Sequence, residues 1–179
     1  QVEMAPRLLM CEDPEVSALI EQRFSREGIR VLTGHAAERC EIVDGEKWLV
    51  TRHGSAEVRI PFDALLVAVG SSANLSGYGL EELGIAVGPA GTLAVDEYLC
   101  STVPTIFACG DVAGPYLFTH MASHQAWYAA VNTLFGRFRR FKVDYSVVPW
   151  ATFTDPEVAR VGLNEDEARQ RNIAYEVTR

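Results

Sequence analysis

The sequence predicts an α/β fold in which helices connect parallel strands, and three stretches of the chain carry this prediction. Residues 1–32 contain a short strand, an amphipathic helix and a second short strand. Residues 65–70 (Leu-Leu-Val-Ala-Val-Gly) are continuously apolar, which is typical of a strand covered on both faces. Residues 105–109 form an apolar run that stops at Gly110-Asp111 and precedes a second helical pattern. Strands that alternate with helices in this way are typical of parallel α/β architectures.

The first strand, helix and strand have clear start and stop signals. Residues 1–3 read as the end of a strand, Asp13 is expected to be the helix N-cap, and Pro14 occupies the first helical position. Gly28 is expected to end the helix, and residues 29–32 form the second strand. Four apolar residues are predicted to share one face of this helix: Val16, Leu19, Ile20 and Phe24.

An antiparallel meander is predicted to follow. Residues 40–43 and 47–51 have strand character, and Asp44-Gly45 between them is a strong hairpin signal. Residues 57–60 add a third strand, so the meander is expected to have one face toward solvent.

The second half of the chain contains further predicted elements. Residues 80–83 are a candidate short helix and residues 92–96 a candidate strand. Residues 119–135 continue without a helix breaker and are predicted to form a helix. Asn164 and Glu167 have the spacing of a capping box at the start of a last short helix.

Gly110 and Asp111 are the candidate ligand-binding residues. Gly110 has no Cβ, so a ligand and the backbone can approach closely, and Asp111 offers acceptors to hydroxyl groups. The first amides of the helix that follows carry a positive partial charge, which suits a phosphate or an electron-rich ring oxygen. The alternative is a buried strand whose Asp caps the next helix.

Composition excludes several classes of protein. The 179 residues are 48% hydrophobic and 22% charged with a net charge of −8, which argues against disorder and against a nucleic-acid surface. His120 and His124 have a zinc-compatible spacing, but no Glu follows His120, so no metal site is expected. The cysteines show no metal-ligand or Cys-x-x-Cys spacing. No signal peptide or long apolar span is visible, so a cytoplasmic location is expected.

Two motifs resemble one known family. The pattern Thr-x-Phe-Ala-x-Gly-Asp at residues 105–111 resembles the second flavin fingerprint of the pyridine nucleotide-disulfide oxidoreductases, which include dihydrolipoamide dehydrogenase and mercuric reductase. Residues 148–162, which contain Phe-Thr-Asp-Pro-Glu, resemble the entry to that family's C-terminal interface domain. Residues 70–74 are similar to the family's Gly-Arg-x-Pro-Asn segment, with Ser71 and Ala73 in place of the Arg and the Pro.

The resemblance covers essentially the whole chain and implies a partial FAD/NAD(P)-binding three-layer (ββα) Rossmann-like fold with the start of an α+β dimerisation domain. Residues 1–70 then correspond to the C-terminal half of an NAD(P)-binding domain, residues 71–148 to a returning segment of an FAD-binding domain, and residues 149–179 to the start of the interface domain. The family's Gly-x-Gly-x-x-Gly turn, redox-active cysteine pair and C-terminal His-Glu base do not occur in the sequence. The chain is therefore expected to be an internal part of a longer flavoprotein and inactive by itself.

The resemblance also implies cofactor-binding residues, and no catalytic residue is assigned to this chain. Asp111 corresponds to the ligand of the flavin ribitol, and the helix start faces the flavin pyrimidine edge. Glu3 ends a strand where an acidic residue binds the nucleotide ribose, which favours NADH over NADPH, although Arg7 is close in sequence and Glu3 also suits a solvated strand end. The implied cofactor-binding residues are Gly110, Asp111, Thr119, His120, Ala122, Glu3, Ala37 and Gly70. Taken alone, Gly70 is equally well explained as a turn glycine.

The function implied by the resemblance is an FAD-dependent oxidoreductase that passes hydride from NAD(P)H to the flavin and then to a disulfide or related acceptor. A homodimer is expected, with no nucleic-acid or membrane partner. Two alternatives remain at this point: an NADH oxidase or ferredoxin-reductase-like flavoprotein without a redox disulfide, and a non-catalytic dimerising module.

Overall fold

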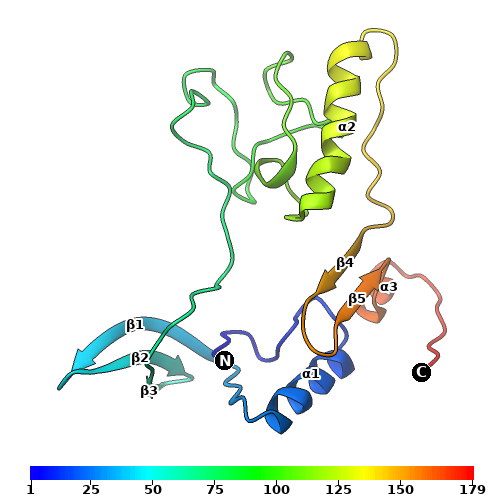
Figure 1. The fold of residues 1–179 in the computed structure, drawn as a ribbon. Helices are drawn as coiled ribbons and strands as arrows, with labels where there is room; N and C mark the ends of the chain where they lie inside the picture. The colour runs from blue at the N-terminus through cyan, green and yellow to red at the C-terminus, as the bar shows by residue number, and fades with distance from the viewer. The chain divides into compact units, whose positions relative to one another are not determined.

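The computed structural model describes every residue from Gln1 to Arg179 and divides the chain into two compact units (Figure 1). Unit 1 contains residues 1–67 and 151–179, and unit 2 contains residues 68–150. No helix is long and apolar enough to span a bilayer. The elements in chain order are α1 (Pro14–Arg26), β1 (His35–Val43), β2 (Glu46–His53), β3 (Ala56–Pro61), the 3-10 turn η1 (Gly110–Val112), α2 (Thr119–Phe135), β4 (Pro149–Thr152), β5 (Val158–Val161) and α3 (Glu165–Gln170).

The unit boundaries at residues 67/68 and 150/151 lie near the predicted domain boundaries, although residues 151–179 group with residues 1–67. The assignment of three domains stays a prediction. The structure combines helices and strands, as the predicted class requires; its three-stranded sheet is antiparallel, and the parallel pairing is a single bridge between Val2 and Leu32.

Helix α1 ends in the local geometry that its sequence predicts. Gly28 adopts a left-handed φ of +80°, and its amide donates to the Ser25 carbonyl at 3.1 Å. The Ile29 amide donates to the Phe24 carbonyl at 2.9 Å. These two bonds form a Schellman motif, in which the left-handed residue costs little because it is a glycine.

Two expectations for the first residues are corrected. Leu19 was expected on the buried face of α1 and is instead 54% exposed, while Ile20 is fully buried. The predicted strands 1–3 and 29–32 do run in parallel, but their pairing is reduced to a single bridge between Val2 and Leu32. A parallel pair is stable when further strands extend it, and no third strand joins this one.

The predicted meander is confirmed. Strands β1, β2 and β3 form an antiparallel sheet in sequence order, and Asp44 and Gly45 connect β1 to β2 with positive φ angles of 53° and 84°. Two positive φ values are typical of the type I′ hairpin that Asp-Gly favours.

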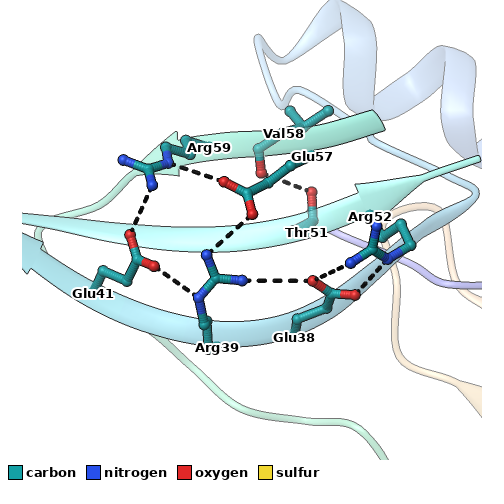
Figure 2. A network of polar contacts seen from close by, with 8 residues as sticks. All are labelled: Glu38, Arg39, Glu41, Thr51, Arg52, Glu57, Val58 and Arg59. Atoms are coloured by element: carbon teal, nitrogen blue, oxygen red, sulfur yellow. Dashed lines mark hydrogen bonds and ion pairs between the residues drawn. The ribbon is translucent and has the colours of Figure 1, made fainter. Parts of the chain in front are cut away.

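One face of the meander carries alternating charges (Figure 2). Arg39 forms ion pairs with three glutamates. Arg52 pairs with one of these glutamates, and Arg59 pairs with the other two. Val50 lies between Arg39 and Arg59 in the cross-strand register and is fully buried, because the alkyl stems of long charged side chains cover apolar surface. The members of the network are Glu38, Arg39, Glu41, Arg52, Glu57 and Arg59, and their formal charges cancel.

The end of the chain forms a two-stranded sheet, β4 and β5, followed by helix α3. The predicted capping box is present: the Asn164 side chain accepts from the Glu167 amide at 2.8 Å, and Glu167 accepts from the Asn164 amide at 3.1 Å. Asp13, the N-cap residue of α1, makes no capping bond to its own helix. Its Oδ1 accepts instead from the Glu165 amide at 3.2 Å.

Unit 2 is built around one apolar cluster that α2 covers. Its buried members are Leu80, Ile85, Leu93, Leu99, Ala108, Ala113, Ala129 and Val143. Most of these residues lie in irregular segments connected by single bridges, while α2 occupies the predicted residues, Thr119–Phe135.

Four element predictions in this half of the chain are wrong. Residues 65–70 form no strand and are exposed rather than covered, with Leu66 at 89% and Val69 at 86% exposure. Residues 92–96 and 105–109 make only isolated bridges, and residues 80–83 form a turn rather than a helix. Strand-forming sequences become strands only when another segment pairs with their backbone, and these segments have no extended partner.

Candidate functional site

The candidate site begins with a tight turn that follows an extended residue. Cys109 is extended, and Gly110–Val112 then form η1, which the Ala113 and Gly114 amides close by donating to the Gly110 carbonyl at 2.9 and 3.1 Å. The chain therefore reverses within a few residues, with Asp111 in the middle of the turn.

Gly110 is required at its position for two reasons. Its φ of +76° lies in the left-handed region that side chains disfavour. A Cβ at this position would also lie 3.3 Å from the Cβ of Ala122 in α2. The absence of a side chain therefore allows the turn to pack directly on the helix.

Asp111 is exposed, and no hydrogen bond or ion pair of the chain uses its carboxylate. Both carboxylate oxygens are thus free to accept hydrogen bonds from a ligand's hydroxyl groups.

Helix α2 begins beside this turn. Phe118 is its N-cap residue, and the bond from the Ala122 amide to the Phe118 carbonyl, at 2.9 Å, is the first helical hydrogen bond. The amides of Thr119 and His120 precede that bond, so they remain donors at the positive end of the helix. This donor set fits an electron-rich ring oxygen or a phosphate.

The side chain of His120 has a different role from its amide. Its Nε2 lies 2.8 Å from the Pro149 carbonyl oxygen, and its ring stacks on Phe118 with 5.3 Å between centroids. The Nε2 of His124 lies 2.9 Å from the Asp144 carbonyl oxygen. Backbone carbonyls therefore occupy the Nε2 of both histidines, and no cluster of three metal-ligating side chains exists in the chain.

The structure brings part of the predicted site together. Gly110 and Ala122 are in contact, and Asp111, Thr119 and His120 lie on the same turn and helix start in unit 2. Glu3 and Ala37 belong to unit 1, and Gly70 lies in the exposed segment at the start of unit 2.

Glu3 and Arg7 do not contact each other. Glu3 Oε1 accepts from the Ala5 amide at 2.7 Å, while Arg7 donates to Ser17 Oγ at 2.6 Å and to the Leu9 carbonyl at 3.0 Å. Arg7 is thus held against the start of α1.

Ala37 and Gly70 offer no side-chain chemistry. Ala37 is exposed and lies at the irregularity in β1, where the register shifts between the Ala37–Thr51 pair and the Arg39–Val50 pair. Gly70 is exposed with a φ of +102°, which suits a turn glycine as well as a close approach to a ligand.

An open hollow of about 480 Å³ lies beside the hairpin in unit 1, and none of the predicted site residues lines it. Its lining is formed by Gly45, Glu46, Lys47, Pro61, Phe62 and Asp63.

Gln125 is a further residue of the site, and no sequence motif indicates it. This residue is fully buried in α2, and its side-chain amide lies between Gly110 and Gly114. The signal available in the sequence was the spacing of Gln125, a polar residue that shares a helix face with the apolar residues Met121 and Ala129. These two residues are buried in α2.

Comparisons with protein families match nearly the whole chain. Residues 1–132 match the family described as pyridine nucleotide-disulphide oxidoreductase, and residues 148–179 match the dimerisation domain of the same family.

Curated relatives include dihydrolipoyl dehydrogenase of Chlamydia pneumoniae, which is 34% identical over 99% of this chain and 37% of that protein. Dihydrolipoyl dehydrogenase of Mycobacterium tuberculosis is 37% identical over 98% of the chain. Mercuric reductase of Streptomyces lividans is 38% identical over 95% of the chain and 35% of that protein. The chain thus spans a little over a third of the length of these relatives.

Solved structures agree with these matches. An HOCl-induced flavoprotein disulfide reductase from Escherichia coli superposes with a TM-score of 0.78 and 28% identity over 94% of this chain and 38% of that one. The Cu(II) complex of the same reductase superposes with a TM-score of 0.81. The fold is therefore a partial Rossmann-like flavoprotein fold together with the start of a dimerisation domain.

Proposed function

Since the chain belongs to the pyridine nucleotide-disulphide oxidoreductase family, we propose that it is part of an FAD-dependent enzyme that uses NAD(P)H to reduce a disulfide or a related acceptor. When bound, a flavin would supply the redox chemistry between the nicotinamide and the acceptor. The residues of this chain bind and orient the cofactors.

The turn at Gly110-Asp111 is the single observation that carries this proposal. An exposed carboxylate without a protein partner lies on a turn that packs on α2 only because residue 110 has no side chain. The carboxylate suits the ribitol hydroxyls of FAD, and the free amides of Thr119 and His120 suit the carbonyl oxygen at the flavin pyrimidine edge.

The nicotinamide cofactor is proposed to be NADH. Glu3 directly follows the parallel bridge between Val2 and Leu32, where its carboxylate suits the two ribose hydroxyls of NADH and repels the 2′-phosphate of NADPH. Arg7 donates to Ser17 and Leu9, so its guanidinium is already used within unit 1. Residues 148–179 match a dimerisation domain, which supports a homodimer for the intact enzyme.

Titration of the 15N-labelled chain with FAD tests the flavin site. We expect amide shifts centred on Gly110, Asp111 and Thr119, because NMR shifts report even millimolar affinities. Asp111→Asn removes the charge and weakens binding by about tenfold, the effect of losing a charge-assisted hydrogen bond.

Glu81→Gln is the control for that titration, because it removes an exposed carboxylate from the same unit and changes the net charge equally. Wild-type shifts that are absent, or that spread evenly over the chain, contradict a flavin site at Asp111. Equal weakening in both variants would show a general charge effect instead.

A further inference from the structure

Gln125 is a fully buried polar side chain on the face of α2 that packs against the turn. Its Oε1 accepts from the Gly110 amide at 2.6 Å. Its Nε2 donates to the Gly114 carbonyl at 2.6 Å and to the Tyr145 hydroxyl oxygen at 2.8 Å. Both amide donors and the acceptor are therefore paired, as the burial of a carboxamide requires.

The backbone partners determine which way this amide points. The Gly110 N–H can only donate, so it must face Oε1, and the Gly114 carbonyl can only accept, so it must face Nε2. If the amide were rotated by half a turn, Nε2 would face the Gly110 N–H and Oε1 would face the Gly114 carbonyl, so neither hydrogen bond could form. The side chain thus has one orientation, and that orientation holds both ends of the turn.

Asp111 lies between the two residues that Gln125 holds. Because its carboxylate has no partner in the chain, the backbone on either side determines the direction in which it points. The same side chain ties the turn to α2, so the carboxylate and the first amides of the helix keep a constant spacing.

We propose that Gln125 is a positioning residue for the flavin site, which sets the direction in which Asp111 presents its carboxylate to the ribitol hydroxyls. This inference rests on the proposed function, because it takes the flavin as the ligand of Asp111. A hydrophobic residue of similar size would leave the Gly110 amide and the Gly114 carbonyl unpaired.

Asn132 provides a matched control on the same helix. It is also buried, its Oδ1 accepts from the Phe141 amide at 2.8 Å, and its Nδ2 donates to the carbonyls of Tyr98 and Phe141 at 3.0 and 2.9 Å. Asn132→Leu therefore removes the same number of hydrogen bonds from a buried carboxamide that does not contact the turn.

Amide hydrogen exchange of the full chain tests the structural half of the proposal without a cofactor. In Gln125→Leu we expect the Gly110 amide to exchange about tenfold faster or more, which is the effect of one lost buried hydrogen bond, while the Phe141 amide is unchanged. Asn132→Leu is expected to show the reverse pattern. Unchanged exchange at Gly110 in Gln125→Leu overturns the proposal.

The FAD titration described above tests the functional half on the same three proteins. We expect Gln125→Leu to weaken FAD binding about fivefold or more relative to Asn132→Leu, since a misdirected Asp111 loses hydrogen bonds to the ligand. Equal weakening in the two variants overturns the positioning role and leaves the flavin site intact. If wild-type protein shows no FAD-dependent shifts, the flavin site itself is overturned and the role of Gln125 with it.

Gln125→Glu covers the case in which the leucine variant does not fold. The glutamate keeps an acceptor for Gly110, and when protonated it also keeps one donor for Gly114. Burial raises the pKa of a carboxyl, so we expect FAD affinity relative to wild type to recover as the pH is lowered to about 6. Wild type at each pH is the reference. If the FAD affinity of Gln125→Glu relative to wild type is the same at neutral pH as at a pH of about 6, the proposal is contradicted.

Discussion

At the scale of single residues, Asp96 organises the segment that precedes the turn. Its Oδ1 accepts from the amides of Tyr98 and Cys100, both at 2.9 Å, and its Oδ2 accepts from Arg140 at 2.8 Å. Burial by itself would raise the pKa of Asp96, but the two amides and Arg140 outweigh burial, so its pKa is lowered. The folded chain therefore binds this proton less tightly than the unfolded chain does.

Asp96→Asn is expected to reduce the free energy of unfolding near neutral pH by about 0.5 to 1 kcal/mol, a small value because the side chain is 44% exposed and partly screened. The contribution of Asp96 is complete above its ordinary pKa and is lost as the pH falls through the lowered pKa of the folded state. Urea unfolding at neutral and acidic pH measures both effects. A difference between Asp96→Asn and wild type that is the same at every pH contradicts this account, and Glu81→Gln is the control.

At the scale of elements, the turn and the helix beneath it form one structural piece. Gly110 and Gly45 both adopt left-handed φ angles, of +76° and +84°. They differ in their surroundings: a Cβ at Gly110 meets Ala122 at 3.3 Å, whereas a Cβ at Gly45 meets nothing within 4 Å.

Alanine substitutions at Gly45 and Gly110 separate the energetic cost of backbone strain from the cost of steric crowding. We expect Gly45→Ala to cost about 1 to 2 kcal/mol from its left-handed backbone alone, and Gly110→Ala to cost more because α2 must also shift. Thermal unfolding of the two variants measures the difference. Equal costs would show that the turn does not pack closely on α2.

At the scale of the whole molecule, ion pairs connect residues far apart in the sequence within unit 1. Arg160 donates to the Cys11 carbonyl at 2.9 Å and to Glu167 at 3.0 Å, and its Nε lies 3.8 Å from Glu12. The side chains of Arg160 and Glu12 are only 11% and 6% exposed. Replacing Arg160 takes a nearly buried cation away from the nearly buried carboxylate of Glu12, and breaking a buried pair is strongly destabilising.

Arg160→Leu is therefore expected to cost about 3 kcal/mol or more in the free energy of unfolding. Arg169→Leu is the control, since Arg169 also pairs with two carboxylates but is 57% exposed, and we expect it to cost much less than Arg160→Leu. Chemical denaturation followed by circular dichroism measures both values. Similar costs for the two variants would show that burial does not strengthen the Arg160 contacts.

Elements whose backbone hydrogen bonds close within the element could be predicted from the sequence alone. Helix α1 with its Gly28 terminus, the Asp44-Gly45 hairpin, helix α2 and the capping box at Asn164 all form as predicted, because their hydrogen bonds join residues close in sequence. The Gly-Asp pattern likewise located the turn that carries Asp111, since a short motif encodes a local geometry.

The other features depend on how segments far apart in the sequence pack together. Residues 65–70 and 105–109 have strand-forming sequences, but a strand needs a second segment to pair with, and a local pattern cannot state whether that segment is present. Gln125 carries no motif, and its contact with the turn exists only because α2 packs on Gly110. The exposed carboxylate of Asp111 could therefore be predicted from the sequence, whereas the side chain that holds its turn in place became visible only in the packed structure.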